Sequence, residues 1–300
     1  MSGVRAYTAA DLPQGSAGWH QLRRARVGSS EVSIIGERSP YGTQGEVWAY
    51  KRGAPVKDRP RDLYLRVGHA LEQLAAELLA EQLGVSLAPG LVIAEERGLM
   101  LASQDRRAGG VPVECKVRFR GAPDYGHWTP ESIPGHVDVQ LTQAVLLHEQ
   151  LTGQRIDVAH VSALLGDAYG LTHRTYEVEM TPARRETWLD LWRPTVTAWW
   201  RAYVLTGERP PDATHEDVAV LVSGSTTTRR DATPEEEVLL EQLRGLDAAR
   251  ADADKAAREA TKTRNAVRDE LARALGPDHT IPGLSWQATG RGKFCLRLEH

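Results

Sequence analysis

The sequence predicts a mixed α/β fold, in which helices flank a central mixed β-sheet and a further helix and β-hairpin are appended at the C-terminus. Three observations predict this fold. Short apolar runs over residues 91–95 and 99–103, and an alternating apolar and polar pattern over residues 111–119, are typical of strands. Apolar side chains recur at helical spacing over residues 63–83. A second helical pattern begins at Pro234, after a stretch rich in Pro, Ser and Thr.

Further elements surround these segments along the chain. Residues 1–18 are expected to be irregular, and Ser29 or Ser30 can cap the start of a short apolar helix. Residues 120–135 contain too much Gly and Pro for regular structure. We expect helices over residues 19–24, 32–36, 44–51, 63–83 and 136–152, and a β-hairpin formed by residues 155–165 and 171–179.

A last helix of the main domain is expected to begin at Thr181 and Pro182 and to be rich in tryptophan. Its tryptophans recur at helical spacing, which favours packing in the core or against a second subunit over stacking on nucleic acid bases. The tryptophans concerned are Trp188, Trp192, Trp199 and Trp200.

The composition divides the chain into a main domain over residues 1–208, a linker over residues 209–233 and an appendage over residues 234–300. The appendage should start with a long helix that ends near Leu275. Because alanine and mixed charges fill the middle of this helix, a solvated helix is favoured over a coiled coil. A short hairpin should close the chain.

The composition also limits the setting in which the protein works. The 300 residues contain no apolar run long enough to cross a membrane, and the N-terminus lacks the apolar core of a signal peptide. The two cysteines, Cys115 and Cys295, are too few for a four-cysteine zinc or iron–sulfur site. We therefore expect a protein of the reducing cytoplasm. Since the net charge is -3, any binding of nucleic acid should depend on local arginine patches.

One hairpin carries a candidate site for chemistry. Gly109 and Gly110 tolerate positive φ and can form its turn. In the second strand, alternation puts Glu114 and Lys116 on one face, and the hairpin can bring Asp105 beside Glu114. Carboxylate oxygens suit Mg²⁺ or Mn²⁺, and a lysine beside them can hold or deprotonate a water. Taken alone, the same pattern is also that of a surface salt bridge.

A second candidate site precedes the short apolar helix. Arg23 lies at the end of one predicted helix, and Ser29 and Ser30 lie at the start of the next. A guanidinium, hydroxyls and free backbone N–H groups together can bind a phosphate. The alternative is a capped helix beside a surface arginine cluster, and the residues alone favour neither reading.

Two further polar residues lie on predicted helices near these sites. Glu72 follows Gly68, which allows a close approach of backbone, so this carboxylate can face a neighbouring site instead of water. Gln140 lies in an amphipathic helix and can line a site or the edge of the core.

The arrangement of Asp105, Glu114 and Lys116 resembles the active site of the PD-(D/E)XK nuclease superfamily. Together with motifs elsewhere, it makes the chain similar to the viral recombinase exonucleases of the lambda/YqaJ type over about residues 19–180. The motifs that carry the resemblance are Trp19-x-x-Leu22-Arg23 followed by Gly28-Ser29-Ser30-Glu31, then Ser39-Pro40-Tyr41, Gly68-His69-Ala70-Leu71-Glu72, Ala102-Ser103-Gln104-Asp105 with Glu114-Cys115-Lys116, and Ile133-Pro134 with Gln140 downstream.

The resemblance implies a role for each candidate residue. Asp105, Glu114 and the carbonyl of Cys115 would hold Mg²⁺, with Mn²⁺ as a substitute. Glu72 would contribute to the metal region, and Lys116 and Gln140 would handle the attacking water. Arg23 with Ser30 would hold the 5′-phosphate of a DNA end. The family usually has Ser-Pro-Asp-Gly where this chain has Ser103-Gln104-Asp105-Arg106, so the geometry of this turn is the open point of the resemblance.

The function expected from this resemblance is that of a Mg²⁺-dependent 5′-to-3′ exonuclease on linear double-stranded DNA. Its product would be a 3′ single-stranded overhang for recombination by strand annealing. The resemblance also implies a single-strand annealing protein as partner, a homo-oligomer in the form of a trimer, and a bacterial or phage-infected host cell. The alternatives are a restriction or repair endonuclease of the same fold and a DNA-binding or assembly protein with a degenerate site.

Overall fold

The computed structural model describes residues 3–55, 63–214, 217–218, 221, 233–275, 284–289 and 293–298 of the chain. The side chains of residues 63–65, 275, 284–289 and 293–298 are outside this description. The chain forms two compact units, Met1–Thr227 and Thr228–His300, and each is described by itself. None of the described helices is both long and apolar enough to span a membrane.

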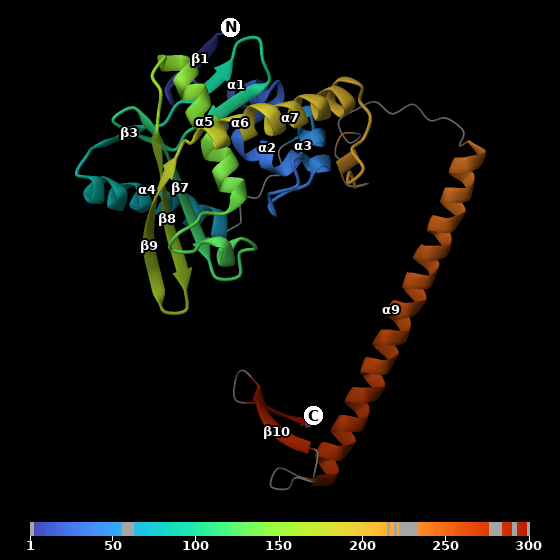
Figure 1. The fold of residues 1–300 in the computed structure, drawn as a ribbon. Helices are drawn as coiled ribbons and strands as arrows, with labels where there is room; N and C mark the ends of the chain where they lie inside the picture. Colours follow the sequence, from blue (N-terminus) through green and yellow to red (C-terminus); the bar gives the residue numbers. More distant parts are fainter. Residues whose placement is uncertain are drawn as a thin grey trace. The chain divides into compact units, whose positions relative to one another are not determined.

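The first unit contains two mixed β-sheets (Figure 1). In the four-stranded sheet the order is β1-β4-β5-β2, with only β2 and β5 parallel. In the five-stranded sheet the order is β3-β6-β7-β8-β9, with only β7 and β8 parallel. The bounds are β1 Val4–Tyr7, β2 Val27–Gly28, β3 Leu87–Pro89, β4 Val92–Glu95, β5 Met100–Ser103, β6 Arg106–Ala108, β7 Val111–Phe119, β8 Val158–Asp167 and β9 Gly170–Glu179.

The expected single central sheet is therefore wrong, and the reason lies at one crossing of the chain. The antiparallel pair β4–β5 of one sheet continues as β3–β6 of the other, and the backbone bends at Gly90 and at Gln104–Asp105. The Gly90 N–H donates to the Asp105 carbonyl at 3.2 Å. A Cβ on Gly90 would lie 1.8 Å from the Gln104 carbonyl oxygen, so only glycine fits this crossing.

Two other expectations near the N-terminus are corrected. Residues 4–7, placed in an irregular lead-in, form β1 at the edge of the four-stranded sheet, where they pair with β4. The short helix begins at Ser29 instead of Val32, and its cap is neither serine. The Glu31 side chain accepts a 2.6 Å hydrogen bond from the Gly28 N–H and so caps the helix from inside its first turn.

Helices pack on both faces of the five-stranded sheet. Ala75, Ala76 and Leu79 of α4 pack with Val113 and the other inward residues on one face of β7. The opposite face of the sheet packs against α5 through a second apolar cluster. The helices up to this point are α1 Ala17–Arg24, α2 Ser29–Ile35, α3 Gln44–Lys51, α4 Leu63–Leu83, the short 3₁₀-helix η1 Tyr125–His127 and α5 Gly135–Thr152.

α5 also covers the four-stranded sheet and so joins the two sheets into one core. Val139, Ala144 and Leu147 on this helix pack with residues of α2, α3, β4 and β5. The sequence predicted α5 to within one residue at its start. Its expected end at Thr152 is confirmed, and Gly153 follows with a φ of 72°, as a helix C-cap requires.

The tryptophan-rich helix is continuous but changes pitch, with α6 Pro182–Thr187, the π-helical η2 Trp188–Trp192, α7 Arg193–Trp199 and the π-helical η3 Trp200–Leu205. Trp188, Trp199 and Trp200 are buried in the main core, which confirms core packing as their role. The chain then returns to α3, because both carboxylate oxygens of Asp212 accept hydrogen bonds from the backbone N–H groups of Gln44 and Gly45.

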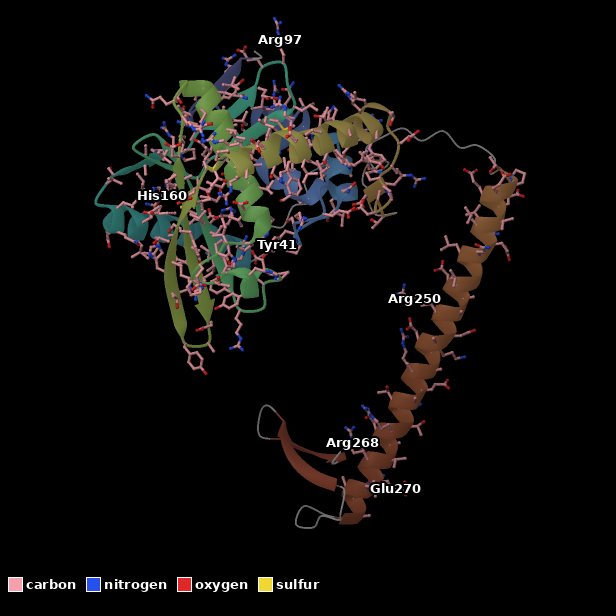
Figure 2. All side chains as sticks on the ribbon, viewed as in Figure 1. Tyr41, Arg97, His160, Arg250, Arg268 and Glu270 are labelled. Carbon is pink, nitrogen blue, oxygen red and sulfur yellow. The ribbon has the colours of Figure 1, made fainter. Side chains whose placement is uncertain are left out.

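The second unit contains α9 (Pro234–Leu275) and a hairpin of β10 (Leu284–Thr289) with β11 (Lys293–Leu298). The expected long helix and closing hairpin are thus present. Within this unit, the described side chains of α9 are almost all exposed, including Leu239 and Leu243. Figure 2 shows them projecting around the helix, with Arg250, Arg268 and Glu270 labelled.

Candidate active site

The second strand of the Gly109–Gly110 hairpin presents the acid and the lysine as the sequence predicted. Both glycines have positive φ, 54° and 94°, and form the turn between β6 and β7. Along β7, alternation turns Cys115 toward α4. Glu114 and Lys116 point the opposite way, toward α5. The five-stranded sheet therefore holds this pair between a strand and a helix.

Glu114 is the centre of the polar contacts on this face. Its side chain is only 2% exposed, and Oε1 accepts hydrogen bonds from the Lys116 ammonium and from the Gln140 amide nitrogen, the latter at 2.5 Å. Gln140 thus lines the site instead of the core edge. Its place on α5 fixes the distance between this helix and β7.

Asp105 and Glu72 approach Glu114 from the bend between the sheets and from α4. Asp105 Oδ2 accepts a 2.8 Å hydrogen bond from the Cys115 N–H, which anchors the carboxylate beside β7. Both carboxylates line a cavity of about 290 Å³ that Cys115 and Trp19 also border. We call Glu72, Asp105, Glu114 and Lys116 the acidic cluster.

The charges of this cluster oppose one another. Burial raises the pKa of Glu114 well above its usual range, the nearby Asp105 carboxylate raises it further, and the Lys116 ammonium only partly compensates. Burial opposes the charged form of Lys116 too, but the carboxylates of Glu114 and Asp105 outweigh it and raise the pKa of Lys116. With every group ionised, the cluster contains three carboxylates and one ammonium.

A divalent cation fits this donor set. Hard oxygen ligands are what Mg²⁺ and Mn²⁺ prefer, and a cation would relieve the repulsion that raises the pKa of Glu114. As the side chains lie in the structure, no group of three or more His, Cys, Asp or Glu among the described residues could hold a metal ion. Two of the oxygens are held instead by Lys116 with Gln140 and by the Cys115 N–H.

The turn at Ser103-Gln104-Asp105-Arg106 is anchored by contacts to α5 and to α4. Gln104 is buried, and its amide nitrogen lies 3.2 Å from His148 Nδ1 on α5. The Arg106 guanidinium donates to the Asp105 carbonyl at 2.7 Å and to Gln73 Oε1 on α4 at 2.5 Å. These two side chains anchor the backbone around Asp105 where the family has proline and glycine.

A second set of buried charges joins α1, α2 and α3. Glu31 lies 3.1 Å from Arg23 Nη2 and 2.6 Å from Lys51 Nζ, and Lys51 is fully buried. Lys51 also donates to the carbonyls of Arg23 and Arg26, at 2.7 and 2.6 Å. We call Arg23, Glu31 and Lys51 the basic cluster, because two cations share one carboxylate.

The basic cluster leaves part of Arg23 available. Its side chain is 19% exposed, its Cζ lies 4.8 Å from the centre of the Trp19 ring, and no partner for its Nε is found among the described residues. A Cβ on Gly28 would approach Arg23 Nη2 to 2.9 Å, so the guanidinium crosses the start of α2 where no side chain is in the way.

The two predicted serines differ in their surroundings. Ser29 is buried, and its hydroxyl donates to the Leu101 carbonyl at 3.4 Å, so that hydroxyl faces the core. Ser30 is exposed on the first turn of α2. Of the two hydroxyls, only that of Ser30 is therefore left for a phosphate beside Arg23.

Sequence reasoning missed a buried carboxylate in the loop after β7. Asp124 is 2% exposed, and it accepts hydrogen bonds from Arg118 Nε at 2.9 Å, from Trp128 Nε1 at 3.2 Å and from the Tyr41 hydroxyl. Burial alone would raise the pKa of Asp124, but the His136 ring at 3.4 Å, the hydrogen bond from Tyr41 and the Arg118 charge lower it. Through the contact with Arg118, Asp124 holds this loop beside the C-terminal end of β7. A loop rich in Gly and Pro gave no signal for it.

A larger cavity, of about 750 Å³, lies between α5, β9 and α6. Of the described residues, those that line it include no candidate site residue, and its Asp138 is paired with Arg184 at 2.9 Å. The smaller cavity is lined by three candidate residues, Glu72, Asp105 and Cys115, but not by Glu114 or Lys116.

Comparisons with known proteins find one matching family and several similar solved structures. Residues 18–149, which include every residue of the acidic and basic clusters, match the family described as YqaJ-like viral recombinase domain. No curated protein matches the chain in sequence.

Among solved structures, an alkaline exonuclease (LHK-Exo) from Laribacter hongkongensis is 14% identical, with 64% of this chain and 94% of that chain covered and a TM-score of 0.45. LHK-Exo in complex with dAMP is 13% identical, with 64% and 95% covered and a TM-score of 0.45. A phage-related exonuclease from Haemophilus somnus 129PT is 14% identical, with 63% and 98% covered and a TM-score of 0.42.

Proposed function

We propose that this chain, whose residues 18–149 form a YqaJ-like viral recombinase domain, is a divalent-metal-dependent exonuclease that degrades linear double-stranded DNA from its 5′ ends. The observation that carries the proposal is the acidic cluster: Asp105 lines a cavity and accepts from the Cys115 N–H, and Glu114 is paired with Lys116 on the same strand. The hairpin β6–β7, with α4 and α5 on its two faces, would then be a PD-(D/E)XK nuclease core.

The chemistry of the donor set supports a proposal for the residues that would hold the metal. Asp105, Glu114 and the carbonyl of Cys115 supply hard oxygens, and Glu72 adds a carboxylate at the cavity wall. When bound there, Mg²⁺ would supply charge stabilisation at the scissile phosphate and lower the pKa of a nearby water.

Side chains on β7 and α5 would position the attacking water and stabilise charge on the phosphate. The Lys116 ammonium and the Gln140 amide both donate to Glu114 Oε1, so both can turn donors toward a water or phosphate oxygen next to that carboxylate. Lys116 would hold the attacking water and stabilise the negative charge that develops on the phosphate. Because α5 and β7 fix these groups, little reorganisation is needed during the reaction.

End recognition would come from the basic cluster. A terminal 5′-phosphate carries more charge than an internal phosphodiester and so gains more from the Arg23 guanidinium and the Ser30 hydroxyl. Digestion from the 5′ end would leave a 3′ overhang, which is the substrate of strand annealing. A single-strand annealing protein as partner and a ring-shaped homotrimer are parts of the same proposal, as is a nuclease domain that precedes the α9 appendage.

Nuclease assays on defined DNA test this function. We expect the wild-type protein to degrade linear duplex with Mg²⁺, to leave covalently closed circles intact and to be inactive in a chelator. Cutting of closed circles would replace the proposal by an endonuclease. Binding of DNA without cleavage under any divalent metal would replace it by a DNA-binding or assembly protein.

A further inference from the structure

Among the described residues of the first unit, Lys51 is the buried cation, and the metal-site chemistry does not use it. Its side chain is fully buried at the end of α3, and its ammonium donates hydrogen bonds to Glu31 Oε2 and to the Arg23 and Arg26 carbonyls. Burying a charge costs several kcal/mol unless partners compensate. A role that requires the charge itself would explain why a lysine is kept there.

Charge balance within the basic cluster suggests this role. Glu31 is shared: Oε2 faces Lys51 at 2.6 Å, and Oε1 faces Arg23 at 3.1 Å. Without Lys51, the Glu31 carboxylate and the Arg23 guanidinium would form a pair with no net charge. With Lys51, the carboxylate is already compensated, and the cluster keeps one positive charge.

That remaining charge lies at the exposed member of the cluster. Lys51 is fully buried and the Glu31 side chain is 8% exposed, whereas the Arg23 side chain is 19% exposed. The Trp19 ring under the guanidinium borders the cavity that contains Asp105. An anion from solvent would therefore meet Arg23 first, and close to the acidic cluster.

We propose that Lys51 is a positioning residue for end recognition: it neutralises Glu31 and thereby leaves the Arg23 guanidinium free to bind a terminal 5′-phosphate. The inference rests on the proposed function, since it concerns the same Arg23 site. Glu31 in turn orients the guanidinium and caps α2 through the Gly28 N–H. The direction of the shifts agrees, because burial and the Arg23 charge lower the pKa of Lys51, to about 8, while the two cations lower that of Glu31 despite its burial.

The test compares the affinity for a short duplex carrying 5′-phosphates with the affinity for the same duplex carrying 5′-hydroxyls, in a chelator so that nothing is cleaved. Lys51→Gln removes the charge but keeps N–H donors for the two carbonyls. We expect it to lower the affinity ratio by about tenfold or more, the usual size of one charge-assisted contact. The control is Arg52→Gln, the same loss of charge at the next, exposed position, which should leave the ratio unchanged.

The double variant Lys51→Gln/Glu31→Gln separates charge from packing. Without the Glu31 carboxylate, Arg23 again carries an uncompensated charge, so the ratio should return to within a few-fold of the wild type. A ratio that stays low in the double variant would show a merely structural role and overturn the proposal, as would a Lys51→Gln ratio equal to that of the wild type. If Lys51→Gln alone does not fold, the double variant decides by the same criterion.

Failure of the end pocket itself would look different. A wild-type protein that binds both duplexes equally would overturn the 5′-phosphate site, and this inference with it, whatever the variants do. Mg²⁺-dependent cleavage of linear duplex by that protein would still support the acidic cluster as the nuclease site.

Discussion

In both clusters, burial and a neighbouring like charge shift the pKa of one buried group toward its neutral form. The group is a carboxyl in the acidic cluster and an ammonium in the basic cluster. In the acidic cluster, burial and a neighbouring carboxylate raise the pKa of Glu114. In the basic cluster, burial and a neighbouring guanidinium lower the pKa of Lys51, although Glu31 opposes the shift. Each cluster holds like charges close together, and a ligand of the opposite charge would relieve the strain. In the proposed function, this difference corresponds to a cation site on β7 and an anion site at the start of α2.

The largest expected effect breaks the acidic cluster. Asp105→Asn keeps an oxygen that can accept from the Cys115 N–H, so the bend between the sheets should fold normally. It removes the charge that a divalent cation needs, and we expect cleavage of linear duplex to fall by more than about a thousandfold. Single-turnover rates with Mg²⁺ measure this. Activity within a few-fold of wild type would remove Asp105 from the metal site.

A smaller loss is expected when only the ammonium is removed. Lys116→Met keeps the length of the side chain but cannot donate to water or phosphate, and losses on the order of 10²–10³ in kcat are usual for one electrostatic contact in an active site. Added Mg²⁺ should not restore the rate, because the oxygen ligands are intact. Recovery at high Mg²⁺ would mean that Lys116 acts on metal affinity and not on the reacting water.

The acidic cluster should also be visible in the stability of the metal-free protein. The pKa of Glu114 is higher in the folded than in the unfolded state, so between these values the folded state binds more protons. The free energy of unfolding should therefore fall as the pH rises from about 5 to 8, by an amount on the order of 1 kcal/mol.

Denaturant titrations in a chelator at the two pH values, for wild type and Glu114→Gln, measure this contribution. The variant has no carboxyl at this position, so its unfolding free energy should fall less over the same range. An equal fall in both proteins would show that Glu114 is not the group that titrates.

The smallest expected effect comes from removing the second unit. Both clusters lie in the first unit, and Asp212 still contacts α3, so a chain ending at Thr227 should keep both sites. We expect its cleavage rate on short duplexes to be within about twofold of the full chain. A chain ending at Glu208 loses the Asp212 cap and should be less stable by about 1 kcal/mol. Loss of folding at Thr227 would mean that α9 completes the first unit.

Local pattern was enough to predict part of the site. Strand alternation put Glu114 and Lys116 on one face, and the Gly109–Gly110 pair marked the turn that presents them. Helical spacing likewise indicated core packing for Trp188, Trp199 and Trp200.

The rest depends on contacts between distant segments, which a single sequence does not reveal. The bend that splits the sheet needs Gly90 to pass over the Gln104 carbonyl. Lys51 reads as an ordinary solvated residue at a helix end, and only the fold brings it under Glu31. Glu31 gave one usable signal, its place three residues after Gly28, which is that of a capping side chain.

One experiment tests the central claim most directly: end binding and cleavage measured separately for Arg23→Ala, Glu114→Gln and the control Arg24→Ala. Arg24 is the neighbouring arginine, and its guanidinium donates a hydrogen bond to the Ala54 carbonyl, whereas that of Arg23 pairs with Glu31. We expect Arg23→Ala to lose the preference for 5′-phosphorylated duplex by about tenfold or more while it still cleaves 5′-hydroxyl duplex. Glu114→Gln should keep that preference and lose cleavage, and Arg24→Ala should keep both. If Arg23→Ala weakened binding to both duplexes equally, or Glu114→Gln still cleaved, the division of labour between the two clusters would be wrong.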